Sequence, residues 1–210
     1  FGTVLSAKVA MDKETGKSKG FGFVEMPVSA EGKDAIESLN DISDWNFERV
    51  KNEAASIWER ELRKIQIKSD DISLKTTFYT ALYHTYLAPN RYSDRFGNYK
   101  GAKGDIKNGT NIYTVQSLWD TFRAANPLLT ITQTELVPSI INSYLTFYDQ
   151  YGLLPVWELQ FNETNCMTGY HAVPIIADAI LKDIKGFNYE KAYQAMKASA
   201  AQNIRGTNFY

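Results

Sequence analysis

The chain has 210 residues and a nearly balanced charge, with 23 Lys and Arg against 24 Asp and Glu. Hydrophobic residues make up 44% and aromatic residues 13%, a globular composition that argues against extensive disorder. Because the charges nearly cancel, the chain as a whole does not attract nucleic acid or an anionic membrane, and any affinity for RNA has to be local.

The sequence also limits the redox chemistry and the membrane partners. A single cysteine, Cys166, leaves no internal disulfide and no cysteine-based metal site. No apolar run approaches the roughly 18 residues of a membrane span, so no membrane partner is expected. No signal peptide opens the chain, so its own compartment is unknown from sequence. The first residue is Phe1 within a strand-like pattern, and we expect the natural N-terminus to lie further upstream.

The first 41 residues predict a hairpin followed by a helix. Apolar and polar residues alternate over 4–9 with the period of two that is typical of a half-buried strand. The polar, glycine-containing stretch 12–20 predicts the hairpin connection, and residues 21–26 predict the second strand. A helix is expected over 29–39, capped by Ser29.

Residues 19–26 read KGFGFVEM and resemble the signature of the RNA recognition motif, K/R-G-F/Y-G/A-F-V-x-F/Y. Only Met26 departs from it, at the final aromatic position. The resemblance implies that Phe21 and Phe23 stack on unpaired bases, with Lys19 beside them. Simple packing of the two rings on a neighbour is the alternative. The first and last strands of that family's sheet have no counterpart here, so binding of single-stranded RNA is expected to be weak.

From residue 42 onward the pattern predicts a succession of helices joined by aromatic-rich loops. Asp44 or Asn46 is expected to cap a helix that runs to residue 65, followed by a short strand over 65–68. Ser73 is expected to cap a helix over 74–88 that Pro89 ends. The next stretch, 89–111, contains four glycines and is expected to be functional or built as hairpins.

The later part of the chain predicts four more helices. Each is expected to start or stop at a residue with known capping or helix-breaking properties. These expectations are a helix from Thr114 to a stop at Asn126–Pro127, a helix started by Thr134 and Pro138 and closed by Gly152, a helix over 168–184, and a helix over 189–204 capped by Asn188. Residues 153–159 are expected to be extended.

Four long stretches between residues 44 and 210 resemble glycoside hydrolase family 92, the calcium-dependent, inverting, exo-acting alpha-mannosidases. The stretches are KTTFYTALYHTYLAPNRYSD, NIYTVQSLWDTFRAANPLLT, LLPVWELQFNETNCMTGYHAVPIIADA and KGFNYEKAYQAMKAS. The resemblance implies a mainly α fold, with part of an (α/α)₆ toroid behind a small N-terminal α+β piece. We therefore expect a truncated recognition motif over 1–41, a junction over 42–72, and the first part of the catalytic domain over 73–210.

The resemblance assigns Trp119 and Asp120 to the binding of a terminal mannose. Aromatic faces stack on the C–H faces of sugars, and carboxylates fix their hydroxyl groups. For Asp120, a buried acid satisfied by Arg123 or by a helix terminus is the alternative from the residues alone. Asn162 and Glu163 are expected to contact the sugar from a loop at the barrel mouth, with Glu158 ranked lower. For Glu158 and Glu163 the alternative is a loop carboxylate or a backbone cap.

The histidines and the first polar loop give further candidates. His171 is a candidate sugar contact at a helix start, although a packed histidine is the default reading. It is not expected to be a metal ligand, because no second histidine lies at ligand spacing. His84 is expected to lie in the core. Asp94 stays open between a site residue and an Asx turn, and the turn is preferred for the neighbouring Ser93.

The expectations about a calcium site and about catalytic residues come only from the resemblance. An inverting glycosidase uses one carboxylic acid and one carboxylate roughly 6.5 to 9.5 Å apart. In the family the acid lies in a segment like E-G-N-A-W-Q-Y, the base before S-A-W, and the calcium site near G-N-E-P. None of these strings occurs here, so we expect part of a mannose-binding surface without a complete calcium site and without turnover by this chain.

Three functions therefore stand as alternatives. The first is a fragment of a secreted or periplasmic bacterial mannosidase, specific for alpha-1,2 bonds, behind a fused piece of a recognition motif. The second is an RNA-binding protein that uses KGFGFVEM. The third is a non-catalytic module that binds a mannose-containing glycan or a protein. An incomplete barrel would also expose apolar flanks, so self-association is expected.

Overall fold

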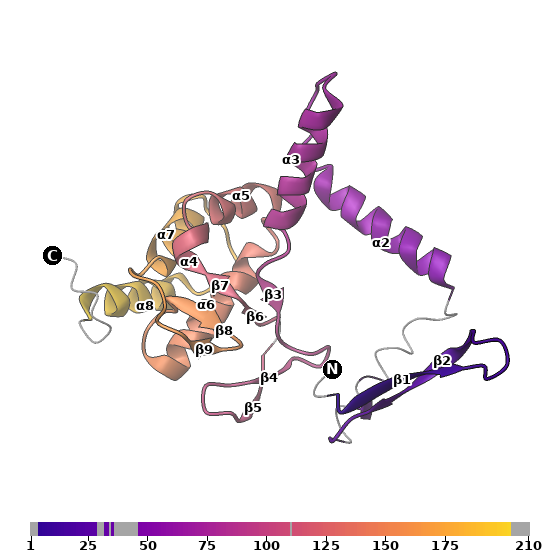
Figure 1. The fold of residues 1–210 in the computed structure, drawn as a ribbon. Helices are drawn as coiled ribbons and strands as arrows, with labels where there is room; N and C mark the ends of the chain where they lie inside the picture. The colour runs from indigo at the N-terminus through magenta and orange to yellow at the C-terminus, as the bar shows by residue number, and fades with distance from the viewer. Residues whose placement is uncertain (1–3, 29–31, 34, 36–45, 110, 203–210) are drawn as a thin grey trace. The chain divides into compact units, whose positions relative to one another are not determined.

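The structure is a computed structural model that describes residues 4–28, 32–33, 35, 46–109 and 111–202. The chain divides into two compact units, residues 1–61 and 62–210, and each is described by itself. Helices dominate the second unit (Figure 1), in agreement with the predicted mainly α fold.

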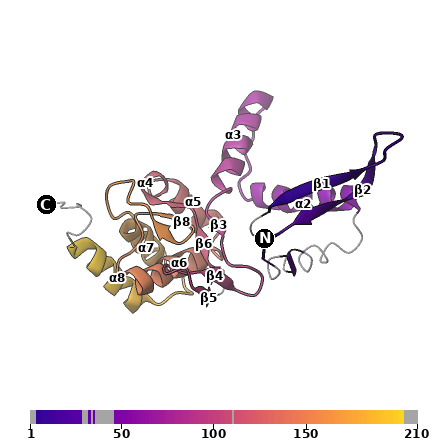
Figure 2. The ribbon, with the colours of Figure 1, turned by 60° about the horizontal axis from the view of Figure 1, so that its bottom comes forward.

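The first unit begins with the predicted hairpin. Strand β1 (Ser6–Met11) pairs antiparallel with β2 (Ser18–Glu25), and the two form a long ribbon (Figure 2). The Asp12 carboxylate closes the connection by accepting hydrogen bonds from the backbone N–H groups of Glu14 and Thr15. The expected half-burial was wrong: Val9 on β1 is 62% exposed, because the two strands lack a packed layer among the described residues. The helix expected over 29–39 lies outside the described residues.

Gly22 lets the two strands approach closely. A Cβ atom at this position would lie 2.7 Å from the backbone oxygen of Lys8, which is closer than real Cβ contacts. We expect Gly22→Ala to disrupt the pairing of β1 with β2 and to speed amide hydrogen exchange over 6–11 and 18–25. Gly32→Ala is the matched control, because nothing lies within 4 Å of a Cβ there. Unchanged protection in Gly22→Ala would contradict the close approach.

Helix α2 (Phe47–Leu62) follows in the first unit, and Asn46 is its cap. The Asn46 side chain accepts a hydrogen bond from the Arg49 N–H at 3.1 Å, whereas the alternative cap, Asp44, lies outside the described residues. None of the residues of α2 is buried, and Arg49 forms an i,i+4 ion pair with Glu53 at 2.6 Å. An exposed pair of this kind stabilises a helix only slightly.

The second unit opens differently from expectation. No strand forms over 65–68; instead the Tyr79 hydroxyl donates to the Ile65 carbonyl and accepts from the Ile67 N–H, so a side chain satisfies this backbone. Helix α3 (Ile72–Thr85) is capped by Asp71, whose carboxylate accepts from the Leu74 N–H at 3.1 Å. Ser73 is therefore not the cap.

The stretch 89–111 is built largely from short strands, as the hairpin prediction had it. Strand β3 (Asn90–Arg91) pairs with β6 (Tyr113–Thr114), and β4 (Asn98–Lys100) pairs with β5 (Ile106–Asn108). The side chain of Gln150 joins the β4–β5 hairpin to helix α6 (Val137–Tyr151): its Oε1 accepts from the Ala102 N–H, and its Nε2 donates to the Tyr99 hydroxyl.

The helix expected to start at Thr114 was wrong. Strand β7 (Gln116–Ser117) leads into α4 (Leu118–Thr121), which has only four residues, and α5 (Ala125–Thr132) runs through Pro127. Pro127 does not stop α5 because it lies in the first turn, where its missing N–H has no helical partner to lose. Val115 has a φ of 65°, which a continuous helix does not allow.

The later helices follow the predicted stops more closely. Gly152, with a φ of 75°, closes α6, and its N–H donates to the Tyr148 carbonyl. Helix α7 (Ala172–Leu181) follows, and the Asn188 side chain caps α8 (Tyr189–Ala201) by accepting from the Lys191 N–H. Between α6 and α7 along the chain, the predicted extended segment forms β8 (Trp157–Leu159). This strand pairs with β7 on one side and with β9 (Asn162–Glu163) on the other.

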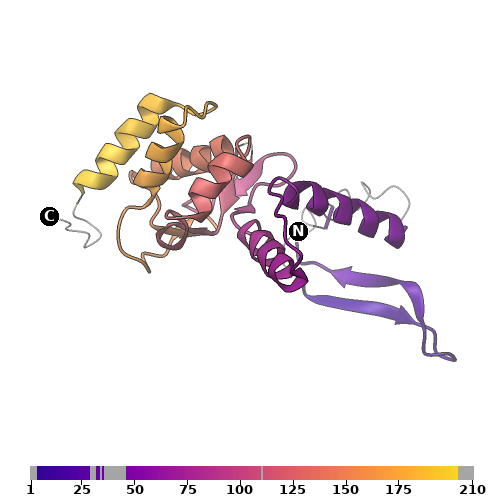
Figure 3. The same cartoon turned by 90° about the horizontal axis from the view of Figure 1, so that it is seen from above.

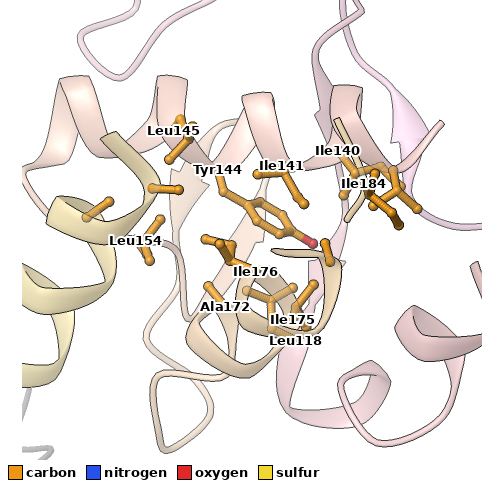
Figure 4. Packing of buried hydrophobic residues seen from close by; sticks show 14 of the residues in the cluster. Leu118, Ile140, Ile141, Tyr144, Leu145, Leu154, Ala172, Ile175, Ile176 and Ile184 are labelled. Carbon is orange, nitrogen blue, oxygen red and sulfur yellow. The ribbon is translucent and has the colours of Figure 1, made fainter. Parts of the chain in front are cut away.

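The main core lies between α6, α7 and α8. The ring of Tyr144 on α6 lies among aliphatic side chains that include Ile176 of α7 (Figure 4). Helices α7 and α8 lie side by side (Figures 1 and 3) and meet through Ala179, Ala192 and Ala195, all 0% exposed. In a second, smaller hydrophobic cluster, residues of the short strands and loops pack against α6. The cluster consists of Tyr99, Ile112, Phe147 and Phe161.

Candidate functional site

Helix α4 carries two of the predicted site residues, Trp119 and Asp120. Strand β7 ends at Ser117, and the Ser117 hydroxyl donates a short hydrogen bond to the Asp120 carboxylate. Asp120 is exposed, so it is not the buried acid that the sequence left open as its alternative. The hydroxyl instead fixes the direction in which the carboxylate points.

Aromatic rings and a guanidinium cluster at the same short helix. The Arg123 guanidinium lies 5.3 Å from the centre of the Trp119 ring and 5.0 Å from that of Phe122. Such cation–π contacts hold the guanidinium in place. The Phe122 ring in turn lies 4.3 Å from the imidazole of His171, with 35° between their planes. The structure thus brings His171, which is distant in sequence, next to the segment that carries Trp119 and Asp120.

His171 occupies the position before α7 but makes no side-chain cap bond. Burial and the nearby charge of Arg123 lower the pKa of His171, against a hydrogen bond with the Thr168 backbone that raises it. The imidazole is therefore mainly neutral at pH 7 and offers one donor and one acceptor. Gly169 makes room for it, because a Cβ there would lie 2.3 Å from the imidazole Cε1.

A hollow of about 210 Å³, open to solvent, lies beside α4. Its volume lies below the range of roughly 300–1,000 Å³ that is usual for small-molecule sites. Its polar lining includes Ser117 and Thr121, which are four residues apart and share one face of the short helix. The remaining lining residues are His84, Thr85, Ala88, Pro89, Val115, Gln116, Ala125, Asn126 and Leu129. His84 is exposed here, so its predicted place in the core was wrong.

Glu163 holds the backbone of its own loop. Its carboxylate accepts from the N–H groups of Val156 at 2.7 Å, Trp157 at 3.0 Å and Asn165 at 2.9 Å. Charge-assisted bonds of this kind are among the stronger ones in proteins. The neighbouring Asn162 is exposed and donates to the Gln160 carbonyl.

Glu158 lies inside the unit, with 2% of its surface exposed. Its Oε1 accepts from the Thr114 hydroxyl at 2.8 Å and from the Phe161 N–H, while its Oε2 has no hydrogen-bond partner. Burial raises the pKa of Glu158 to about 7, against the hydrogen bonds that lower it. Leaving a buried polar atom without a partner costs about 1–3 kcal/mol, so this carboxyl is an exception that calls for a reason.

Asp94 forms the Asx turn that was one of its two sequence readings. Its carboxylate accepts from the N–H groups of Phe96 and Asn98 and from the Asn98 amide. Burial alone would raise the pKa of Asp94, but these hydrogen bonds outweigh it and the pKa lies below its ordinary value. Ser93, also expected to serve the turn, is buried and accepts from the Ile112 N–H.

Of the three predicted RNA-binding residues, Phe23 is the one whose side chain is described. It is 67% exposed on β2, opposite Lys8 of β1. Lys19 and Phe21 lie on the same strand, but their side chains are outside the described part of the structure.

Sequence reasoning missed Ser117 and Phe122, and it named Arg123 only as a possible partner of Asp120. Two signals were present in the sequence: a serine three residues before Asp120, the spacing at which a hydroxyl and a carboxylate meet in a helical turn, and an arginine four residues after Trp119. The contact between Phe122 and His171 had no such signal, because the two belong to different elements.

A calcium site was tested on the donor set. Among the residues that the structure describes, no three His, Cys, Asp or Glu side chains gather closely enough to hold a metal ion. The described residues therefore hold no cluster of ionisable side chains that fits the calcium the resemblance implies. Over the same part of the chain, no helix has the length and apolar character needed to cross a bilayer.

Comparison with known proteins gives two matches along the chain. Residues 34–209 match the glycosyl hydrolase family 92 catalytic domain, and residues 1–45 match the RNA recognition motif. The chain is 56% identical over 39 residues to a chloroplastic 31 kDa ribonucleoprotein of Nicotiana sylvestris, which covers 19% of this chain and 12% of that protein.

Two relatives match most of the chain. The family GH92 alpha-mannosidase BT3965 of Bacteroides thetaiotaomicron, also solved in complex with mannoimidazole, is 39% identical with a TM-score of 0.77 over 82% of this chain and 24% of its own. An uncharacterized secreted glycosidase of Arthroderma benhamiae is 26% identical over 75% of this chain and 17% of its own length. The chain thus spans a quarter or less of these relatives.

The matched range covers most of the chain and includes the cluster around α4, the hollow and the β8–β9 loop. The match places the chain in the class of the glycoside hydrolases. The chain belongs to glycosyl hydrolase family 92, through that family's catalytic domain.

Proposed function

We propose that this chain contributes part of the mannose-binding surface of a secreted or periplasmic, exo-acting, inverting alpha-mannosidase that acts on alpha-1,2 bonds of glycans. The observation that carries the proposal is the cluster of Trp119, Asp120, Arg123 and His171 around α4, next to an open hollow. Family membership and the name of the Bacteroides relative support the choice of mannose.

In this proposal each side chain has a distinct role. The Trp119 face packs on the C–H face of the sugar, and Asp120 accepts hydrogen bonds from its hydroxyl groups. Arg123 donates, and the neutral imidazole of His171 both donates and accepts. Asn162 contacts the sugar from the hairpin edge.

The other predicted carboxylates have support roles. Glu163 shapes the loop that presents Asn162, because three backbone N–H groups bind its carboxylate. The Asx turn of Asp94 shapes the entrance to β4. For Glu158 the buried position supports a positioning role.

Calcium dependence belongs to the family resemblance, and no step is routed through a metal here, since the described residues do not form a fitting donor set. We propose that residues 73–210 form the first part of an (α/α)₆ toroid, after a junction over 42–72 and a recognition-motif piece over 1–41. We also propose that these 210 residues bind sugar without turning it over, because strings like those around the family's acid and base do not occur in them.

Titration with mannose and with mannoimidazole, followed by tryptophan fluorescence, tests the proposal. We expect a saturable change in the wild-type chain and a loss of affinity of at least tenfold in Asp120→Ala. The exposed Glu135→Gln is the control, because it lies outside the cluster. No saturable change with either ligand would sink the proposed function, and release of mannose from alpha-1,2-mannobiose would sink the claim of binding without turnover.

Binding of single-stranded RNA is a second candidate, favoured by the exposed Phe23 and by the match over residues 1–45. Stacking of a base on an aromatic ring contributes about 1–3 kcal/mol. A salt-sensitive response to single-stranded RNA that weakens in Phe23→Ala would support it. A response that does not depend on Phe23 would contradict it.

A further inference from the structure

The turn between β8 and β9 has an unusual backbone. Its two central residues, Gln160 and Phe161, have φ values of 50° and 61°. A two-residue hairpin turn with both φ values positive normally uses Asn and Gly, because a side chain is strained in this region. Here the second residue is a phenylalanine that is 1% exposed. Something in the surrounding structure has to hold this turn closed.

Side chains from two other segments hold it. The Gln160 N–H donates to the Thr114 hydroxyl at 2.6 Å, and that hydroxyl donates to Glu158 Oε1. The Phe161 N–H donates to the same Oε1, and the Phe161 carbonyl accepts from the Tyr151 hydroxyl at 3.1 Å. Glu158 Oε1 is thus the acceptor on which the bonds from β6 and from the turn converge.

A second buried polar atom without a hydrogen-bond partner lies on the next strand. Gln116 lies directly across from Glu158 in the β7–β8 pair, so the two side chains share one face of the sheet. Gln116 is 4% exposed and its Nε2 has no partner, while its Oε1 accepts from the Tyr144 hydroxyl. Glu158, Gln116 and Tyr144 line one small space that is too narrow to hold a water molecule, so the two atoms stay without a partner.

The titratable groups around this carboxyl come from four segments. Tyr92, Tyr113 of β6 and Tyr144 of α6 are phenols, and Glu163 of β9 is a second acid. The charge of Glu163 adds to burial in disfavouring a charged Glu158. The surroundings therefore suit a neutral carboxyl.

We propose that Glu158 is the positioning residue of this part of the molecule: its carboxyl closes hairpin 158–165 against residues 114–116, and a negative charge on it opens the hairpin. The hairpin carries Asn162 and Glu163, and Gln116 leads directly into Ser117 and Asp120. The link to sugar binding rests on the proposed function; the closure itself does not.

Ionisation opens the hairpin because the charge is better solvated once the carboxyl reaches water. With a pKa of about 7 in the closed state and 4.5 when exposed, opening becomes about tenfold more favourable per pH unit between these values. Below pH 4.5 both states hold the proton, and above pH 7 neither does, so the effect is confined to that window.

Amide hydrogen exchange on the full chain tests the proposal. We expect the opening constant of the Gln160 and Phe161 amides, corrected for intrinsic exchange, to rise about 40-fold from pH 5 to pH 7. Glu158→Gln keeps the acceptor and removes the charge, so it should flatten this rise to less than about threefold. The exposed Glu135→Gln should retain it.

Two results would overturn the proposal. The first is an equal pH slope in the wild type and in Glu158→Gln. The second is exchange of Gln160 and Phe161 only together with the core of α6, because that outcome describes a structural residue and not a hinge for the hairpin.

A second arm separates this proposal from the proposed function. Mannose at ten times its Kd should suppress hairpin opening about tenfold if sugar binds only the closed form. Mannose that fails to bind counts against the proposed function alone, since the pH slope and its loss in Glu158→Gln still stand. Mannose that binds without suppressing opening counts against the coupling of the hairpin to the site.

Discussion

The free energy of unfolding of this chain should fall by about 3 kcal/mol between pH 4.5 and pH 7, and Glu158→Gln should remove that fall. Burial raises the pKa of Glu158 to about 7 in the folded chain, whereas the unfolded chain releases this proton near 4.5. In this window the folded state binds one more proton than the unfolded state. The stability is therefore fully present below pH 4.5 and is lost as pH rises to 7.

Urea unfolding at several pH values, followed by circular dichroism, measures this effect. The difference between the wild type and Glu158→Gln isolates Glu158 from His171, whose lowered pKa makes the chain more stable as pH rises and so acts in the opposite direction. Asp94 has a lowered pKa and affects stability only at more acidic pH. A wild-type profile parallel to that of Glu158→Gln would contradict the buried, neutral carboxyl.

Ile176→Ala should destabilise the second unit by about 2–5 kcal/mol. Ile176 is 0% exposed on α7 and packs in the main core, next to the ring of Tyr144 (Figure 4), so its removal leaves a cavity. Leu181→Ala is a matched control on the same helix, because Leu181 is 86% exposed and its truncation should change stability by less than about 0.5 kcal/mol. Both are measured by urea unfolding at one pH. Equal effects of the two substitutions would show that α7 does not pack as described.

The two units differ in their sequence matches and in the burial of their side chains. The hairpin of the first unit has a specific RNA-recognition signature, yet its side chains stay largely exposed. The second unit has an aliphatic core, the cluster on α4 and most of the match to glycosyl hydrolase family 92. The experiments above test the two separately, because sugar titration concerns α4 and RNA titration concerns β2.

Local signals in the sequence predicted local structure well. The KGFGFVEM strand and its hairpin, the closing Gly152 and the Asn188 cap were all expected and are present. Each depends on residues within a few positions of one another, where turn and cap chemistry decide the backbone. The predictions failed where two residues could both act as a cap, as with Asp71 and Ser73 before α3. They also failed at Pro127, because proline can end a helix or lie in its first turn.

The candidate site shows the same limit. Trp119 and Asp120 were found because they are adjacent, and the resemblance gave them a role. The Asx turn of Asp94 was one of two open readings, since an aspartate beside a glycine-rich loop fits both.

By itself the sequence determined the helical class, the hairpin and the family, because these depend on periodicity, turn residues and long matching stretches. Only the tertiary structure decided that Glu158 is buried beside Gln116, that Glu163 binds three backbone N–H groups, and that His171 packs on Phe122. The burial and the partners of a side chain depend on segments that are distant along the chain. Two glutamates of one short segment therefore differ: Glu163 binds backbone N–H groups, whereas Glu158 is buried and favours the neutral form, because different groups fold around them.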